Sequence, residues 1–160
     1  MIMIIRNGHT TSFHDENHKY YYDGEVVLST TQAMEVVGLR KALPNTDFIR
    51  QRAEFGTFVH REIEEFETEG KRPLSAEGRF WVKYGHPLAD KWECEVMFGN
   101  ADFAGTCDAI GRNADGSIIL VDHKTGQVDE NLVSWQLSIY YRGLVFAGLI
   151  PENAPVSLIC

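Results

Sequence analysis

The sequence contains few cysteines, and none of them is part of a pairing motif. Its 160 residues include three, Cys94, Cys107 and Cys160. They form no C-x-x-C pair, and an odd number argues against a disulfide framework. Cys94 and Cys107 lie in strand-like segments, where a cysteine usually behaves as a small core residue. We therefore expect reduced thiols, a cytosolic location, and core packing for these two side chains rather than nucleophilic chemistry.

Long apolar runs are also missing. No stretch approaches the length needed to cross a bilayer. The opening segment Met1–Ile5 is too short for the apolar core of a signal peptide and has no basic region before it, so we expect a buried strand there and no export. Internal repeats and low-complexity tracts are not evident. These observations predict one soluble domain over residues 1–160, with no membrane association.

Basic residues are outnumbered. The chain has 15 lysines and arginines against 23 acidic residues, a formal net charge of −8. This weighs against tight nucleic-acid binding, because affinity for phosphates comes from lysine and arginine. It weighs less against catalysis on a nucleic acid, which needs only a local basic track. The residues that could form such a track are Arg40, Lys41, Arg50, Arg52, Arg61, Lys71, Arg72 and Arg79.

Hydrophobic periodicity and turn residues predict alternating helices and strands. A hairpin is expected over 20–28 around Asp23-Gly24, and a short helix over 32–37, capped by Ser29 or Thr30 and ended by Gly38. A long helix should begin within 44–47 and end near Gly70. The remaining expected elements are a short helix over 75–84 with Phe80 and Trp81 as packing residues, a strand over 92–98, a helix over 132–146 and a strand over 156–160. In the long helix, the expected core stripe consists of Phe55, Val59, Ile63 and Phe66.

The tripeptide Asp122-His123-Lys124 follows the apolar run 118–121 and is the most informative motif. On an extended strand Asp122 and Lys124 share one face, and His123 points to the other. The preceding turn predicts a hairpin loop from Ala114 to Gly116 in which Asn113 pairs with Ser117. That register places Asp108 opposite Asp122, and Thr106 opposite Lys124.

Two carboxylates opposed on one face repel each other unless a positive charge lies between them. Oxygen ligands suit a hard cation such as Mg²⁺ or Mn²⁺, which also accepts phosphate oxygens. The arrangement therefore indicates a phosphate-ester site built from Asp108, Asp122 and Lys124. The alternative is an ordinary surface ion pair between Asp122 and Lys124, with Asp108 solvated.

Other polar residues could form the walls of this site. On the flank of the long helix, Gly56, His60 and Glu64 lie one turn apart, and His60 is the strongest of them as a functional residue. Glu95 could reach the site or face solvent. Gln136 and Tyr140 are one turn apart and could hold a phosphate, a base or Lys124, or could be ordinary edge residues. The polar stretch with His14, Asp15, Glu16 and His18 is better explained as a solvated loop than as a metal cluster.

Taken in order, these motifs resemble a known family. Gly56-Thr57-x-Val59-His60 with Glu64, Gly105-x-x-Asp108, Asp122-x-Lys124-Thr125-Gly126 and Gln136-x-x-x-Tyr140 together resemble the RecB-like branch of the PD-(D/E)xK nucleases. The segment with Lys19-Tyr20, Gly24 and Ser29-x-Thr31-Gln32 is similar to phage-type exonucleases. The resemblance spans residues 18–141.

The resemblance implies a restriction-endonuclease-like α/β fold, a central mixed sheet flanked by helices, with the catalytic core over 45–146 after an N-terminal strand and hairpin over 1–30. It implies metal-dependent cleavage of DNA, most simply by an exonuclease of phage or bacterial recombination and repair that leaves 5′-phosphates. The setting would be the cytosol of a bacterium or a phage-infected host. A single-strand annealing or recombination partner and a homo-oligomer are both compatible with it.

Carried over residue by residue, the resemblance assigns metal ligation to His60, Asp108, Asp122 and the His123 main-chain carbonyl. Lys124 would be the catalytic lysine, and Gln136 and Tyr140 would position substrate or lysine. Asp122 stands where the family usually has a glutamate, which bears on the choice between magnesium and manganese. The short C-terminus departs from larger members, so their product-end or partner elements are not expected here. Two other functions remain open, an inactive DNA-binding or assembly module and a hydrolase of small phosphate esters.

Overall fold

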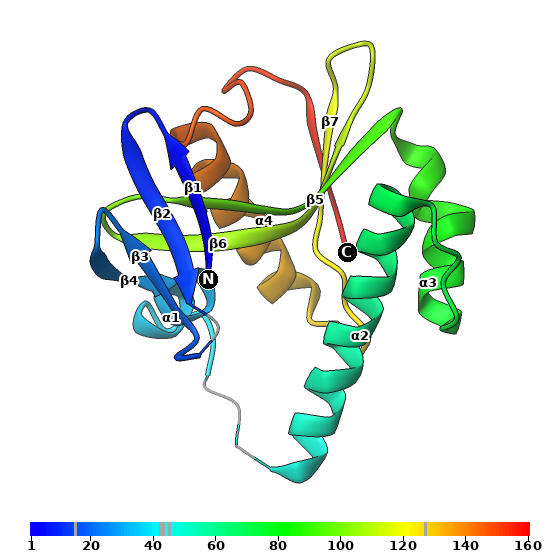
Figure 1. Ribbon diagram of the computed structural model, residues 1–160, viewed down its shortest axis with the longest axis horizontal. Coiled ribbons are helices and arrows are strands. Elements are labelled where there is room, and N and C mark those ends of the chain that lie inside the picture. Colours follow the sequence, from blue (N-terminus) through cyan, green and yellow to red (C-terminus); the bar gives the residue numbers. More distant parts are fainter. Residues whose placement is uncertain (15, 42–43, 45, 127) are drawn as a thin grey trace.

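The computed structural model describes residues 1–14, 16–41, 44, 46–126 and 128–160. Within them the chain forms a mixed α/β structure with a large mixed sheet (Figure 1). The strands are β1 (Ile2–Arg6), β2 (His9–His14), β3 (Lys19–Tyr22), β4 (Glu25–Ser29), β5 (Lys91–Gly99), β6 (Phe103–Arg112), β7 (Ile118–Val121) and β8 (Val156–Ile159). The helices are α1 (Thr30–Val36), α2 (Asp47–Glu69), α3 (Ala76–Phe80) and α4 (Glu130–Phe146). Directly after α3 come a π-helical turn, Trp81–Gly85, and a 3₁₀ turn, His86–Leu88.

Strand β6 organises the sheet. It pairs antiparallel with β5 over nearly its whole length. Its other edge pairs first with β4, in parallel at Phe103 and Ala104, and later with β7, antiparallel from Ala109 to Arg112. Between these two pairings the edge of β6 has no strand partner among the described residues, and Asp108 lies in this interval. Beyond β7, strand β8 extends the sheet in parallel.

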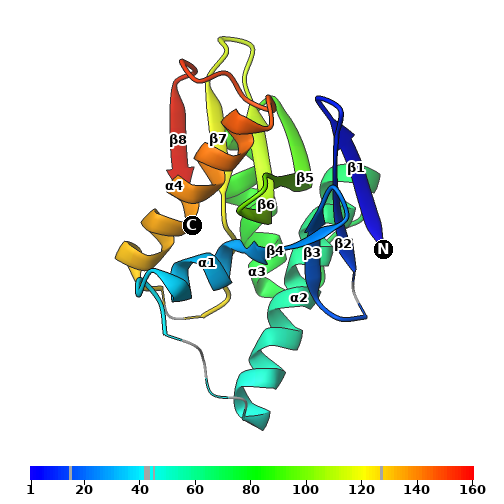
Figure 2. The same cartoon turned by 90° about the vertical axis from the view of Figure 1, so that its left-hand side faces the viewer.

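Helices lie on both faces of the sheet (Figure 2). Each face has its own core of buried side chains. On one face, α4 packs Val133, Leu137 and Leu144 against residues of β5, β6 and β7. On the other, Val59 and Ile63 of α2 pack with Trp81 and with the opposite faces of the same strands. Of the motifs expected to make a site, His60 lies on α2, on one face of the sheet, and Gln136 and Tyr140 lie on α4, on the other.

Strand β5 reverses its faces at Glu95. Trp92 and Cys94 pack on the α2 side, whereas Val96 and Phe98, which continue the same alternation in sequence, pack on the α4 side. Glu95 lies between them with φ 51°, a left-handed conformation that costs a non-glycine residue about 1–2 kcal/mol. The sequence predicts the strand correctly, but regular alternation does not reveal a strand that turns over in its middle.

The segment 2–29 forms an antiparallel meander, β1 to β4, whose hairpin turn at Asp23-Gly24 is confirmed. Strand β2 was not predicted. The expectation of a buried strand at 1–5 is wrong in its burial: β1 is an edge strand that pairs only with β2 among the described residues, and Met1, Ile2, Met3 and Ile5 are all more than half exposed. Short apolar runs occur at sheet edges as well as in cores, because one face of such a strand can remain open.

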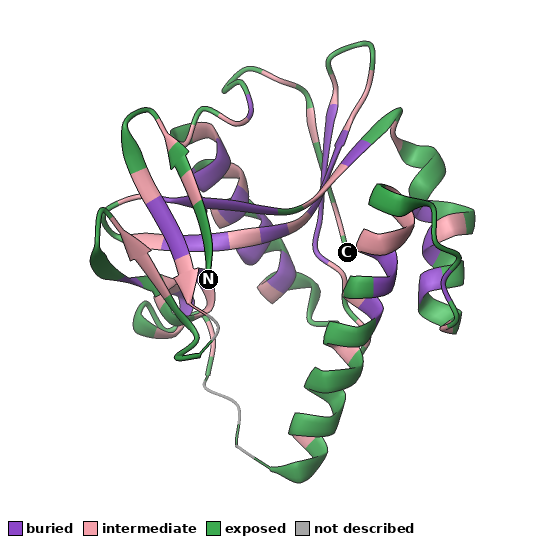
Figure 3. Cartoon of the chain, in the orientation of Figure 1, coloured by how far each residue is buried: buried purple, intermediate pink, exposed green. Residues whose placement is uncertain are grey.

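The predicted helix boundaries are close to the observed ones. Ser29 caps α1 through a capping box with Gln32, and Gly38 adopts the expected positive φ just beyond its end. Thr46 caps α2, and Gly70 ends it in the left-handed conformation. Two packing predictions are wrong: Phe55 is 42% exposed and Phe80 is 64% exposed. The N-terminal half of α2 projects beyond the sheet, so its apolar stripe continues past the core (Figure 3).

Candidate active site

The predicted hairpin register is confirmed, but the strand pairing ends before the predicted pairs Asp108–Asp122 and Thr106–Lys124. The Asn113 amide donates to the Ser117 carbonyl at 3.0 Å, and β6 and β7 pair from Arg112–Ile118 to Ala109–Val121. Continuing that register would place Asp108 opposite Asp122. Instead Asp122 leaves the strand, and the Asp108 carboxylate accepts the His123 amide at 2.7 Å.

The predicted pairing of Thr106 with Lys124 is wrong for the same reason, because Lys124 lies outside the ladder. The Thr106 hydroxyl lies 3.0 Å from the Tyr20 hydroxyl instead. This contact joins the hairpin of the N-terminal meander to the strand that carries Asp108. Sequence patterns gave no signal for it, since the two residues lie in distant segments.

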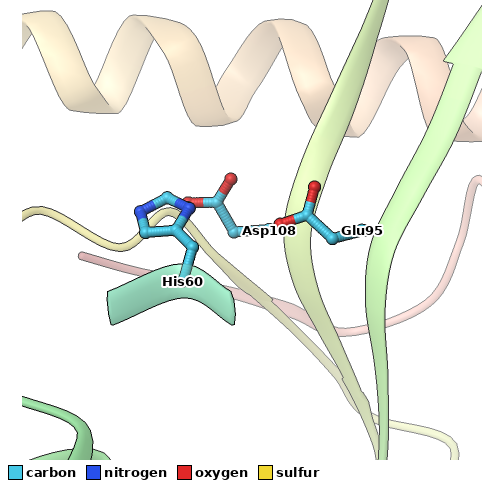
Figure 4. A group of neighbouring side chains, drawn as sticks. All are labelled: His60, Glu95 and Asp108. Atoms are coloured by element: carbon cyan, nitrogen blue, oxygen red, sulfur yellow. The ribbon is translucent and has the colours of Figure 1, made fainter. Parts of the chain in front are cut away.

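Three potential ligands from three elements come together beside the part of β6, residues 105–108, whose edge opposite β5 has no strand partner among the described residues. His60 on α2, Glu95 on β5 and Asp108 on β6 each offer an atom, and these atoms all lie within 4.8 Å of one another (Figure 4). His60 and Asp108, which the sequence analysis assigns to one site, are thus close together, and Glu95, which the sequence left undecided, lies in the same group. Glu64 is not in this group. Its charge nevertheless contributes to the raised pKa of Glu95.

The hydrogen bonding of His60 fixes which of its ring nitrogens is free. Nε2 lies 3.0 Å from the His123 carbonyl oxygen, which can only accept, so Nε2 carries the proton. In the neutral ring Nδ1 is then an unprotonated acceptor, and it lies 3.7 Å from Asp108 Oδ2. Two acceptors facing each other are unfavourable unless a proton or a cation lies between them. Histidines that bind metals are commonly oriented in this way, by donating the other N–H to a backbone carbonyl.

The carboxylates of this group hold protons unusually strongly. Burial raises the pKa of Asp108 to about 6, with the charge of Asp122 acting in the same direction and His60 opposing it. Glu95 is exposed as a residue, but its carboxylate faces the other acids, and loss of water together with the charge of Asp108 raises its pKa to about 7. Burial is the main cause of both shifts, and the repulsion between the acids adds to it.

Asp122 and Lys124 form a second, adjoining unit. Asp122 is 1% exposed, and its Oδ2 lies 2.6 Å from Lys124 Nζ. Its Oδ1 accepts the Gln136 amide at 3.0 Å, and the same amide nitrogen lies 2.7 Å from the Tyr140 hydroxyl. The Gln136 carbonyl oxygen is 3.4 Å from Lys124 Nζ. Gln136 thus contacts both the buried aspartate and the lysine, and Tyr140 contacts Gln136.

The His123 ring packs among other rings. It packs edge-to-face against Trp81 with ring centroids 4.7 Å apart, and burial lowers the pKa of the ring to about 3. The imidazole is therefore neutral. The main chain of His123 bonds to the site, its amide to Asp108 and its carbonyl to His60, and its ring meets the His60 ring edge-to-face with centroids 5.6 Å apart. This agrees with the expected alternation of side chains around Asp122.

The N-terminal polar stretch forms no metal-ligand group in the part of the chain that the structure describes. His14 Nδ1 lies 3.8 Å from the exposed Glu16, and its ring stacks at a tilt on Tyr21. Asp15 lies outside the described residues. The three cysteines are free thiols: Cys107 is buried and Cys94 partly buried in strands, as expected.

No family model, curated protein or solved structure matches this chain. Within the described residues, no helix is both long and apolar enough to span a membrane. The function must therefore be inferred from the geometry of the site.

Proposed function

We propose that this protein is a metal-dependent DNA nuclease with a restriction-endonuclease-like fold, acting in the cytoplasm. The observation that supports it best is the adjacency of two units: the group formed by His60, Glu95 and Asp108, and the buried Asp122 that holds Lys124. A group rich in carboxylates suits a hard cation, and a nearby ammonium suits a substrate that gains negative charge during reaction.

The residues present fit a divalent cation such as Mg²⁺ or Mn²⁺. The free Nδ1 of His60 faces a carboxylate, and burial together with the neighbouring acids raises the pKa values of Asp108 and Glu95, which a bound cation would oppose. His60, Glu95 and Asp108 would hold the ion, with Asp122 and the His123 carbonyl as neighbours. When bound, such an ion polarises a phosphoryl oxygen and lowers the pKa of a bound water.

The protein's own groups supply the rest of the chemistry. Lys124 Nζ, held by Asp122 and Gln136, can donate hydrogen bonds to the attacking water or to a phosphoryl oxygen on which charge accumulates. Asp122 is buried and satisfied on one side by Gln136, so it keeps the ammonium in a fixed position rather than letting it sample solvent. Tyr140 in turn fixes the amide of Gln136.

DNA is the substrate that we propose, with cleavage leaving a 5′-phosphate and with a role in phage or bacterial recombination and repair. A single-strand annealing or recombination partner and self-association belong to the same proposal. The deciding experiment is digestion of end-labelled linear DNA and closed circular DNA with Mg²⁺ or Mn²⁺. Loss of linear DNA from its ends, with circles left intact, supports an exonuclease.

The matched variants are Lys124→Ala and Lys83→Ala, the second being an exposed lysine on the π-helical turn. Lys124→Ala is expected to abolish cleavage without loss of fold, and Lys83→Ala to cleave as the parent does. Equal activity of Lys124→Ala and the parent would refute the assignment. If neither DNA substrate is cut but a nucleotide monoester is, the protein is a small phosphate-ester hydrolase; if nothing is cut and metal binding produces no thermal shift, an inactive binding module is favoured.

A further inference from the structure

The projecting half of α2 exposes aromatic side chains. Phe48 is 63% exposed, Phe55 42% and Phe58 36%. This part of the helix extends past the sheet and is largely open to solvent (Figures 1 and 3). Large apolar side chains gathered on a free helix surface commonly mark a binding site, because their exposure to water is unfavourable.

Arginines alternate with these aromatic residues. Arg52 lies over the ring of Phe48 at 5.6 Å, and Arg61 lies over the ring of Phe58 at 5.9 Å. Neither guanidinium has a carboxylate within ion-pair distance among the described residues. In a chain of net charge −8, these are uncompensated positive charges held beside aromatic faces. The combination favours a ligand with both phosphates and flat rings.

The surface formed by Phe48, Arg52 and Phe55, here called the Phe48 face, leads to the candidate active site. These three side chains line a hollow of about 200 Å³ together with Gln51 and Thr125, the residue after Lys124. The Arg52 guanidinium lies so close to Gly126 that a side chain there would collide with it. The face thus borders the loop that carries the lysine.

A second cavity continues from the same point. It has a volume of about 540 Å³, and both Thr125 and Lys124 contribute to its wall. Its lining is mainly apolar and includes the aromatic residues Phe80, Trp81 and Tyr84. Two hollows that share Thr125, one on each side of it along the same stripe of α2, therefore form a track beside Lys124.

We propose that the Phe48 face binds an unpaired segment of the DNA strand next to the scissile phosphate, with bases stacked on Phe48 and Phe55 and a phosphate on Arg52. This inference rests on the proposed function and adds the substrate form to it. Base faces are accessible for such stacking only where the strand is unpaired, and stacking on aromatic side chains tolerates any sequence. In duplex DNA the faces of the bases are covered by their neighbours.

The test measures binding separately from cleavage. Fluorescence anisotropy would follow a labelled oligothymidylate, and a labelled blunt duplex of equal length, in EDTA so that nothing is cut. Phe48→Ala and Phe55→Ala are each expected to weaken binding of the single strand by roughly 5- to 100-fold. Phe146→Ala is the matched control, because Phe146 is also 63% exposed but lies at the end of α4. This variant should bind the single strand as tightly as the parent protein does.

Arg52→Ala tests the phosphate contact. When the logarithm of the binding constant for a single strand is plotted against the logarithm of the salt concentration, the slope becomes less negative by about 0.7 for each phosphate contact removed. Arg52→Ala should show this change, and Arg142→Ala, an exposed arginine of α4, should not. Single-strand binding that is absent, or that is unaffected by all three substitutions on the Phe48 face, overturns this inference. Lys124-dependent cleavage would still uphold the nuclease in that case, so the two proposals fail independently.

Discussion

Replacement of Asp108 by asparagine is expected to stabilise the metal-free protein while it abolishes metal binding. The Asp108 side chain is 12% exposed, and burial raises the pKa of its carboxyl group from 3.8 to about 6. One pKa unit corresponds to about 1.4 kcal/mol, so the ionised carboxylate costs the metal-free fold on the order of 3 kcal/mol. Asparagine keeps the size of the side chain and an oxygen for the His123 amide, but it carries no charge.

The sign of the effect with pH follows from the direction of the shift. The folded protein holds the Asp108 proton more tightly than the unfolded chain does, because its pKa of about 6 lies above the ordinary 3.8. The loss of folding stability caused by the ionised Asp108 carboxylate is therefore absent below about pH 4, grows between about pH 4 and 6, and is complete above about pH 6. Asp108→Asn should gain about 2–3 kcal/mol over the parent near pH 8, and nothing near pH 4.

Thermal unfolding followed by circular dichroism in EDTA would measure this. For a chain of this length, the gain corresponds to a rise in Tm of roughly 4–12 °C. Asp102→Asn, an exposed aspartate just before β6, is the matched control and should leave the Tm unchanged. Excess Mn²⁺ should raise the Tm of the parent and not that of Asp108→Asn. An Asp108→Asn variant that is no more stable than the parent near pH 8 would refute the account of a destabilising, buried Asp108 carboxylate.

Three further predictions concern the neighbours of Asp108. The affinity for Mn²⁺, measured by calorimetry, should fall below about pH 7 and more steeply below about pH 6. The reason is that Glu95, with a pKa of about 7, and Asp108, with a pKa of about 6, bind protons in competition with the cation. A constant affinity across this range would exclude both residues as ligands. Gln136→Leu leaves the buried side chains of Asp122 and Tyr140 without their amide partner. The free energy of unfolding, measured with urea, should therefore fall by about 1–3 kcal/mol. Turnover should fall more than the affinity for Mn²⁺, and equal losses of the two would contradict a positioning role. Glu95→Gly should be more stable than Glu95→Gln by up to about 1 kcal/mol, and both should bind Mn²⁺ weakly. Glycine relieves a left-handed backbone that costs about 1–2 kcal/mol, but its entropy offsets about 0.5–1 kcal/mol of that gain. Equal stability of the two variants would show that the backbone is not strained.

Local signals in the sequence were sufficient for elements that local chemistry determines. The Asp23-Gly24 turn, the Ser29 cap and the Gly70 helix end each depend on the conformational preferences of one or two residues, and each is found where the pattern predicts it. The register of the β6–β7 hairpin follows from its turn in the same way. Asp108 could therefore be placed near Asp122 without any knowledge of the remaining fold.

Features that depend on distant segments could not be predicted in this way. Phe55 continues the apolar stripe of α2, yet it is exposed because the sheet does not extend beneath that half of the helix. The contact between Tyr20 and Thr106 depends on where the meander docks. Glu95 was undecided because alternation assigns it to one side of β5, and only the reversal of the strand directs its carboxylate toward Asp108.

The site lies where the sheet is least regular, and this irregularity explains how so many polar groups can meet beside a core. β4 leaves the edge of β6 after Ala104, and β7 begins to pair only at Ala109, so the segment that ends at Asp108 is open on that edge. The chain after β7 can then bend, which lets His123 bond to Asp108 and His60 rather than to a strand. A continuous ladder through this interval would satisfy the same backbone groups, but it would direct the His123 amide and carbonyl away from the Asp108 and His60 side chains. We therefore infer that the interrupted pairing, together with the reversal at Glu95, is what assembles the site.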